Sequence, residues 1–149
     1  MVTAFIGLVL ILGSSWGYAA DAGAKEEAVA MVKKGIDYIK ANGRAKAFAE
    51  FTNPQGKFRD RSLYLVVSDM NAKILAHGQN KDLVGMNMMD YKDVDGKEVM
   101  KERVALMKAH KTAWQNYKFI NPATNKIEPK QMYLERYEDL VIACGVYKK

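Results

Sequence analysis

The feature that most constrains the fold is a run of three β-type segments at the end of the sequence. Residues 112–120, 130–137 and 140–147 are rich in β-branched and aromatic side chains, which are typical of strands. Residues 138–139 form a tight turn between the last two segments, and residues 121–129 form a longer turn between the first two. Successive strands joined in this way pair antiparallel. The C-terminal third is therefore predicted to be an antiparallel sheet.

Helices and a second hairpin precede these strands. Residues 24–42 carry apolar side chains at spacings of three and four, the pattern of an amphipathic helix, and residues 44–51 form a shorter helix. Residues 63–68 and 74–77 are predicted strands of a hairpin. After an irregular stretch, residues 95–110 are predicted to be helical. With 149 residues the chain has the length of one domain, and this order of elements predicts an α+β domain with helices packed on an antiparallel sheet.

The first twenty residues are uncharged and contain a short apolar block. Gly17 and Ala19 occupy the −3 and −1 positions of a secretory cleavage site, so residues 1–20 are predicted to be a signal peptide. The mature domain would then be residues 21–149, and it would be periplasmic or secreted. Because no Lys or Arg precedes the apolar block, an uncleaved N-terminal anchor is the alternative.

Composition excludes several classes of protein. The net charge of +6 is spread along the chain without a basic run, so no nucleic acid partner is expected. A single Cys excludes an internal disulfide, and no spacing for a zinc finger or c-type haem is present. No cofactor is expected. No catalytic motif such as GxSxG or HExxH occurs either, which argues weakly against an enzyme.

An ordered set of short sequences between residues 58 and 147 indicates a family. The set comprises Phe58-Arg-Asp60, Tyr64-Leu-Val-Val67, Lys73-Ile-Leu-Ala-His77, Leu83-Val-Gly-Met-Asn87, Asp93-Val-Asp-Gly-Lys97, Trp114-Gln-Asn-Tyr117, Asn121-Pro122, Pro129-Lys130, Tyr133 and Gly145-Val-Tyr147. In this order the chain resembles the single Cache domain, a PAS-like extracytoplasmic sensor module of bacterial chemoreceptors and histidine kinases. One departure is Ala72, where the family usually places Gly.

The resemblance implies a long N-terminal helix on a five- to six-stranded antiparallel sheet, with a helical crossover and a pocket on the other face. It also implies a non-catalytic sensor that binds a short organic acid or a similar metabolite. Receptors of this family carry the signal inward through a membrane helix after the domain. We therefore expect a membrane-bound signalling partner, or simple carriage of the ligand; the oligomeric state is left open.

Lys130 is the leading candidate for contacting such a ligand. A Lys between apolar strand residues needs an anion beside it when it is buried. That anion would be a ligand carboxylate or an internal Asp or Glu; otherwise the side chain is simply exposed at the start of its strand. The resemblance favours the ligand.

The remaining candidates supply hydrogen bonds and apolar walls. They are Tyr64, Tyr117 and Tyr133 as hydroxyl donors, Trp114 and Met88 as walls, and His77 as a further donor. For each of them an ordinary place in the core is the alternative. Lys130 and Tyr133 differ by three positions, as do Trp114 and Tyr117. In regular strands the members of each pair point to opposite faces, so these four cannot all line one pocket without a bulge.

Two segments carry residue types that bind metals. Met86, Met88 and Met89 form a cluster of thioethers that would suit Cu(I), which makes copper handling the rival function, although Met is also a common filler of cores. Residues 93–96 resemble part of a calcium loop, but a capping box formed by Asp95 and Glu98 accounts for them better. No metal site is therefore predicted. A structural or interaction domain without a ligand is the third interpretation.

Overall fold

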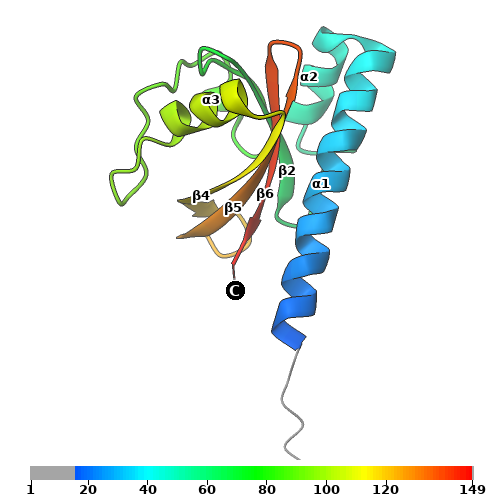
Figure 1. Ribbon diagram of the computed structural model, residues 1–149. Helices are drawn as coiled ribbons and strands as arrows, with labels where there is room; N and C mark the ends of the chain where they lie inside the picture. The colour runs from blue at the N-terminus through cyan, green and yellow to red at the C-terminus, as the bar shows by residue number, and fades with distance from the viewer. Residues whose placement is uncertain (1–15, 149) are drawn as a thin grey trace, which may run out of the picture.

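The computed structural model describes residues 16–148, with side chains from residue 23 onward. It confirms the predicted α+β fold (Figure 1). The elements are α1 (Trp16–Asn42), α2 (Arg44–Thr52), β1 (Arg59–Asp60), β2 (Leu63–Asp69), β3 (Ile74–His77), the 3-10 helix η1 (Lys81–Leu83), α3 (Val99–Ala109), β4 (Thr112–Asn121), β5 (Lys126–Tyr137) and β6 (Leu140–Tyr147). The strands form one antiparallel sheet of six in the order β1-β2-β6-β5-β4, and β3 pairs with β2 beside β1. Among the described helices, none has an apolar stretch long enough to cross a bilayer.

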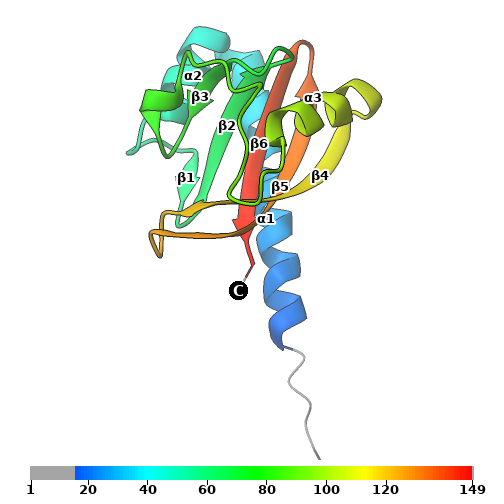
Figure 2. The ribbon, with the colours of Figure 1, turned by 90° about the vertical axis from the view of Figure 1, so that its left-hand side faces the viewer.

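Each face of the sheet is covered by a different layer. The helix α1 packs along one face, and α3 with the crossover that precedes it lies over the other (Figures 1 and 2). Because side chains alternate along a strand, Tyr133 of β5 belongs to the core beneath α1, whereas Met132 and Leu134 belong to the core beneath α3. Alternate residues of a strand therefore belong to different cores, one on each face of the sheet.

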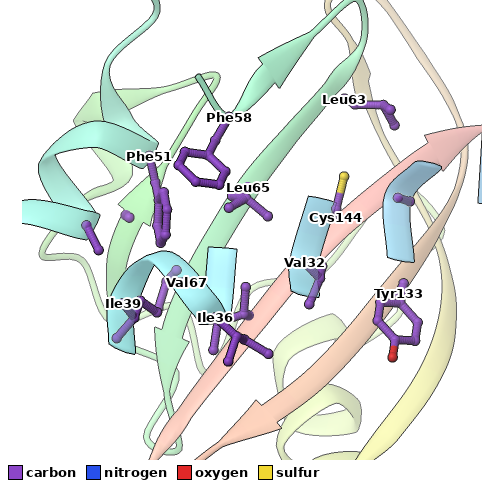
Figure 3. Close-up of a cluster of buried hydrophobic side chains, with 14 of the residues drawn as sticks. Val32, Ile36, Ile39, Phe51, Phe58, Leu63, Leu65, Val67, Tyr133 and Cys144 are labelled. Carbon is purple, nitrogen blue, oxygen red and sulfur yellow. The ribbon is translucent and has the colours of Figure 1, made fainter. Parts of the chain in front are cut away.

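The core beneath α1 and α2 is mostly aliphatic and contains a pair of packed phenylalanine rings (Figure 3). Phe51 of α2 meets Phe58 edge-on, with ring centroids 4.6 Å apart, and both side chains are buried. Gly35 lets α1 approach the sheet closely, since a Cβ there would lie 2.7 Å from Cδ1 of Leu65. This core packs one face of the sheet against α1 and α2, and the cavity described below lies on the opposite face.

Several boundaries differ from those predicted. The helix α1 begins at Trp16 rather than at residue 24, and the first fifteen residues of the predicted signal peptide lie outside the described part of the chain. The strand β5 begins at Lys126, so the predicted turn over residues 121–129 shrinks. In the first hairpin turn Ala72 adopts a left-handed backbone with φ 63°, the conformation that glycine adopts without strain.

The predicted capping box before α3 is wrong. The helix begins at Val99, and Glu98 makes no capping hydrogen bond with its side chain. Asp93 organises this segment instead. Its Oδ1 accepts hydrogen bonds from the backbone N–H groups of Asp95 and Lys97, each at 3.0 Å, and its Oδ2 accepts one from that of Lys118 at 3.0 Å. The carboxylate therefore ties the end of the crossover to β4 and holds α3 over the sheet.

Candidate ligand-binding site

A cavity of about 40 Å³ lies between the sheet and the layer formed by α3 and the crossover. Most of its wall is aliphatic or thioether, supplied by Val66, Ile74, Leu83, Met88, Val99, Met100 and Met132, with Phe119 completing the apolar part. The polar side chains of the wall are Tyr64, His77, Tyr91, Arg103 and Tyr117. At roughly 10–15 Å³ for one water, this volume holds about three water-sized groups. The cavity therefore suits a very small molecule with one polar end.

Arg103 is the cation in the cavity wall, and it was not among the residues predicted from the sequence. It projects from α3 with 4% of its surface exposed, and its Nε donates a hydrogen bond of 3.0 Å to Oε1 of Gln115. Its guanidinium carbon lies 5.6 Å from the centre of the Tyr117 ring. No carboxylate of the described residues lies within 4.0 Å of this guanidinium. A buried guanidinium without a carboxylate partner is a binding group for an anion.

A signal for Arg103 was present in the sequence. The apolar stripe of α3 consists of Met100, Val104 and Met107, all of them buried. Arg103 occupies the i+3 position of that stripe, which is the same helix face. A charged residue inside the apolar stripe of a helix indicates a buried charge that needs a partner.

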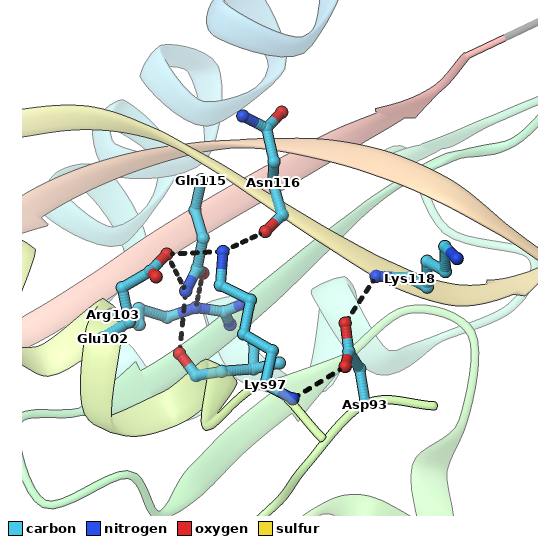
Figure 4. Close-up of polar contacts among 8 residues, drawn as sticks. Asp93, Lys97, Glu102, Arg103, Gln115, Asn116 and Lys118 are labelled. Carbon is cyan, nitrogen blue, oxygen red and sulfur yellow. Dashed lines mark hydrogen bonds and ion pairs between the residues drawn. The ribbon is translucent and has the colours of Figure 1, made fainter. Parts of the chain in front are cut away.

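Gln115 fixes the position of Arg103 (Figure 4). Its side chain is 1% exposed, and its Nε2 donates to the carbonyl oxygen of Val99 at 2.7 Å and to Oε1 of Glu102 at 3.1 Å. Nζ of Lys97 lies 3.1 Å from the same Glu102 oxygen and also donates to the backbone carbonyl of Asn116. The Glu102 charge is therefore already paired with Lys97, and Gln115 presents only a neutral oxygen to Arg103.

Lys130 is buried beside the cavity rather than in its wall. The side chain is 1% exposed, and Nζ donates a hydrogen bond of 2.8 Å to the hydroxyl oxygen of Tyr64. Nζ also lies 4.3, 5.4 and 4.9 Å from the ring centres of Tyr64, Phe119 and Tyr147. Among the side chains of residues 23–148 no carboxylate lies within 4.0 Å of it. An internal acid partner and an exposed position are therefore both wrong for Lys130, and burial lowers its pKa from 10.5 to about 7.

His77 is a neutral donor at the cavity. Its Nδ1 accepts hydrogen bonds from the backbone N–H groups of Gln79 at 3.2 Å and Asn80 at 2.9 Å, so the ring proton sits on Nε2. Burial lowers the pKa of His77 to about 3, and the positive charges of Lys130 and Arg103 contribute to this decrease. The imidazole therefore stays uncharged at neutral pH and keeps one N–H to donate.

The structure brings together only part of the predicted set. Tyr64, Tyr117, His77 and Met88 line the cavity. Trp114 and Tyr133 lie on the opposite face of the sheet, with ring centroids 5.3 Å apart. Nζ of Lys25 from α1 lies 5.3 Å from the centre of the Trp114 ring, and the Tyr133 hydroxyl donates to Glu135. The predicted division of these residues between two faces is confirmed.

The sulfur-containing side chains are dispersed. Met88 lines the cavity and Met89 packs, partly buried, against the same core, whereas Met86 is 49% exposed. In the described part of the chain no group of three His, Cys, Asp or Glu side chains could hold a metal ion. Cys144 is buried on the face beneath α1, with Sγ 3.8 Å from Sδ of Met31, and burial raises its thiol pKa to about 12.

Three solved structures with a similar fold come from chemotaxis or chemosensory proteins. A methyl-accepting chemotaxis protein from Vibrio parahaemolyticus superposes with a TM-score of 0.72 at 23% identity, over 87% of this chain and 92% of that one. A Cache chemosensory domain described as recognising carboxylic acids gives 0.71 at 21% identity, over 89% and 98%. The periplasmic sensor domain of a chemotaxis protein gives 0.68 at 22%, over 88% and 94%. At these identities the likeness defines the class of fold, that of Cache-type sensor domains.

The family follows from the sequence match. The family described as single Cache domain 2 matches residues 19–149 of this chain. The chain therefore belongs to the single Cache domain 2 family, and the resemblance drawn from residues 58–147 is confirmed.

Proposed function

We propose that this protein is a non-catalytic sensor domain that binds one short monocarboxylate in the cavity beneath α3. The observation that carries the proposal is the pair of buried cations, Arg103 in the wall and Lys130 behind Tyr64, neither of which has a carboxylate within 4.0 Å among the described residues. Burying a charge is costly unless an opposite charge compensates it. A carboxylate in the cavity would supply that charge.

The polar groups around the cavity match one carboxylate and little else. The guanidinium of Arg103 and Nε2–H of His77 would donate to its oxygens. The ammonium of Lys130 can only donate, so the Tyr64 hydroxyl accepts that bond. The rest of the wall is apolar and would surround a short alkyl group.

The size of the cavity limits the ligand and its affinity. A volume of about 40 Å³ fits acetate or propionate and leaves no room for a second carboxylate. A ligand of about four or five heavy atoms gains at most roughly 6–8 kcal/mol, so we expect a dissociation constant of about 1 µM or weaker. Such an affinity suits a domain that reports changing concentrations of an abundant metabolite.

The test is calorimetry of residues 21–149 with acetate and propionate, with acetamide as the neutral isostere of acetate. We expect the acids to bind and acetamide to bind at least about tenfold more weakly, because a charged hydrogen-bond partner contributes about 1.5–3 kcal/mol. Arg103→Met should weaken acetate binding by about 10- to 100-fold. Arg61→Met is the matched control, because the Arg61 side chain is 64% exposed and does not line the cavity. Equal affinity for acetate and acetamide, or an Arg103→Met variant that binds acetate like its parent, would refute the proposal.

The site of action is proposed on different grounds. The predicted signal peptide over residues 1–20 and the likeness to a periplasmic sensor domain both support export of the domain. A membrane-bound partner would then carry the signal into the cell. Fractionation of cells that express the full chain tests this: release with the periplasmic contents supports it, and retention in the cytoplasm contradicts it.

A further inference from the structure

Lys130 reaches Tyr64 by crossing over an intervening strand. Lys130 lies on β5 and Tyr64 on β2, and β6 runs between these two strands. In the register of the sheet, Lys130 pairs with Tyr147 of β6 and Met132 pairs with Gly145. The neighbouring pair of Leu65 with Cys144 places Tyr64 next to Gly145 on the other side of β6. The path of the lysine side chain therefore passes directly over Gly145.

The missing side chain of Gly145 leaves this path open. A Cβ at this position would lie 2.3 Å from Cε of Lys130 and 3.1 Å from its Cδ, with Sδ of Met132 at 2.8 Å. Real Cβ atoms essentially never approach other atoms to less than 3.0 Å, so the lysine would have to move. The clashing atoms belong to the outer part of a flexible side chain, so the lysine can give way, but its ammonium end would then leave the Tyr64 hydroxyl and the aromatic rings that surround it.

The backbone does not explain a glycine here. The glycines with positive φ in the described chain are Gly43, Gly85 and Gly96, so Gly145 has a φ that any residue adopts. Glycine inside a strand also costs stability relative to residues with a side chain. Its presence at position 145 is therefore explained by space alone.

We infer that Gly145 is a positioning residue for the sensor site: it is the gap that lets Lys130 place a buried cation behind Tyr64. This inference rests on the proposed function for its consequence, the affinity for a carboxylate, but not for its geometry. An alanine at position 145 would push the lysine off β6 and remove one of the two cations next to the cavity. Carboxylate affinity would fall even though the substituted residue does not line the cavity.

The experiment compares four variants: Gly145→Ala, Lys130→Ala, the double variant, and Gly35→Ala. The last is a matched control, because it introduces the same methyl group and a contact of 2.7 Å, to Leu65, on the opposite face of the sheet. In the ligand-free protein labelled with ¹³C at lysine Cε, NMR should show one lysine, absent from Lys130→Ala, that titrates near pH 7. Gly145→Ala should move that midpoint toward 10.5, and Gly35→Ala should leave it unchanged.

Acetate calorimetry provides the second measurement. Gly145→Ala should weaken acetate binding by the same factor as Lys130→Ala, and the double variant should show no further loss, because both substitutions remove the same cation. A midpoint that stays near 7 in Gly145→Ala would overturn the inference, as would a further loss of affinity in the double variant. Absence of acetate binding to the wild type would refute the proposed function alone, since the NMR titration needs no ligand.

The denaturation midpoint is a third measurement, and it remains informative if the Gly145→Ala variant folds poorly. In the Lys130→Ala background the clashing lysine atoms are gone and only the 2.8 Å contact with Sδ of Met132 remains, so Gly145→Ala should lower the denaturation midpoint less than it does in the wild type. If Gly145→Ala unfolds and the double variant folds, the clash with Lys130 is demonstrated. If Gly145→Ala lowers the midpoint by the same amount in both backgrounds, the obstruction is Met132 rather than Lys130 and the inference is wrong.

Discussion

The buried ammonium of Lys130 should make the ligand-free protein more stable as the pH rises from 7 to 9. A lysine whose pKa falls from 10.5 in the unfolded chain to about 7 in the folded one holds fewer protons in the folded state between these two values. The free energy of unfolding rises with pH wherever the unfolded state binds more protons. The expected slope is therefore positive in this window, and the destabilisation is complete below pH 7.

The magnitude follows from the two pKa values. At 1.36 kcal/mol for each pH unit, the difference between 10.5 and about 7 corresponds to about 5 kcal/mol of destabilisation at low pH. Of this, about 2 kcal/mol should be recovered between pH 7 and pH 9. The side chain is fully buried, so solvent screening does not reduce the figure.

Other groups near Lys130 do not titrate in this window. Burial lowers the pKa of His77 to about 3 and raises that of Cys144 to about 12, and it also raises the pKa values of the nearby tyrosines, Tyr64, Tyr117 and Tyr147. The change between pH 7 and pH 9 can therefore be assigned to Lys130.

Urea unfolding at half-unit steps from pH 6.5 to pH 9 measures the effect. Lys130→Met, which keeps an unbranched side chain of similar length without the charge, is the comparison. We expect the wild type to gain about 2 kcal/mol between pH 7 and 9 and the variant to change little. Parallel pH profiles for the two proteins would show that Lys130 is not a buried titrating group and would refute the reasoning.

Two further predictions concern the framework of the site. Asp93→Ala should lower the free energy of unfolding by about 1–3 kcal/mol and increase the amide exchange of Lys97 and Lys118, because three backbone N–H groups lose their acceptor. Asp95→Ala, which removes only an exposed ion pair with Lys118, is the control, and equal effects of the two substitutions would contradict the role of Asp93. Phe51→Ala should cost about 3–5 kcal/mol in denaturant unfolding while leaving acetate affinity unchanged in the folded fraction, because Phe51 is 1% exposed on the face opposite the cavity. A cost below about 1 kcal/mol would show that this core is not tightly packed.

The fold could be predicted where local chemistry and tertiary structure agree. Strands β2, β3, β4 and β6 lie within about a residue of the segments predicted from β-branched and aromatic composition. The early part of β5 could not be found in this way, because Pro129 argues against a strand. Its carbonyl oxygen accepts a hydrogen bond from Lys148 N, on the β6 side, and β6 pairs with β5 only from Lys130 onward. The missing N–H therefore falls where the sheet does not require a donor.

The candidate site could be predicted only in part. The sequence shows which strand residues share a face, but it does not show which face the crossover and α3 cover. Parity correctly placed Lys130 and Tyr133 on opposite faces, and likewise Trp114 and Tyr117, whereas the grouping across the two strands follows from their register. Which pair faces the cavity depends on whether α1 or α3 covers a given face, and local patterns carry no information about that choice. The helix α3 lies over the sheet because Asp93 ties the end of the crossover to β4, a contact between residues distant in the sequence.

The low pKa of Lys130 predicts how binding depends on pH. Burial lowers this pKa to about 7, so the empty site reduces its charge by releasing the Lys130 proton. An anion in the cavity would raise the pKa of Lys130 again, and binding would take up a proton. At pH 7.5, with the pKa of the empty site at about 7, we expect an uptake of about 0.8 proton for each acetate bound. Calorimetry in two buffers of different ionisation enthalpy measures this number. Lys130→Ala should bring it to nearly zero, and equal uptake by the two proteins would show that the proton goes elsewhere.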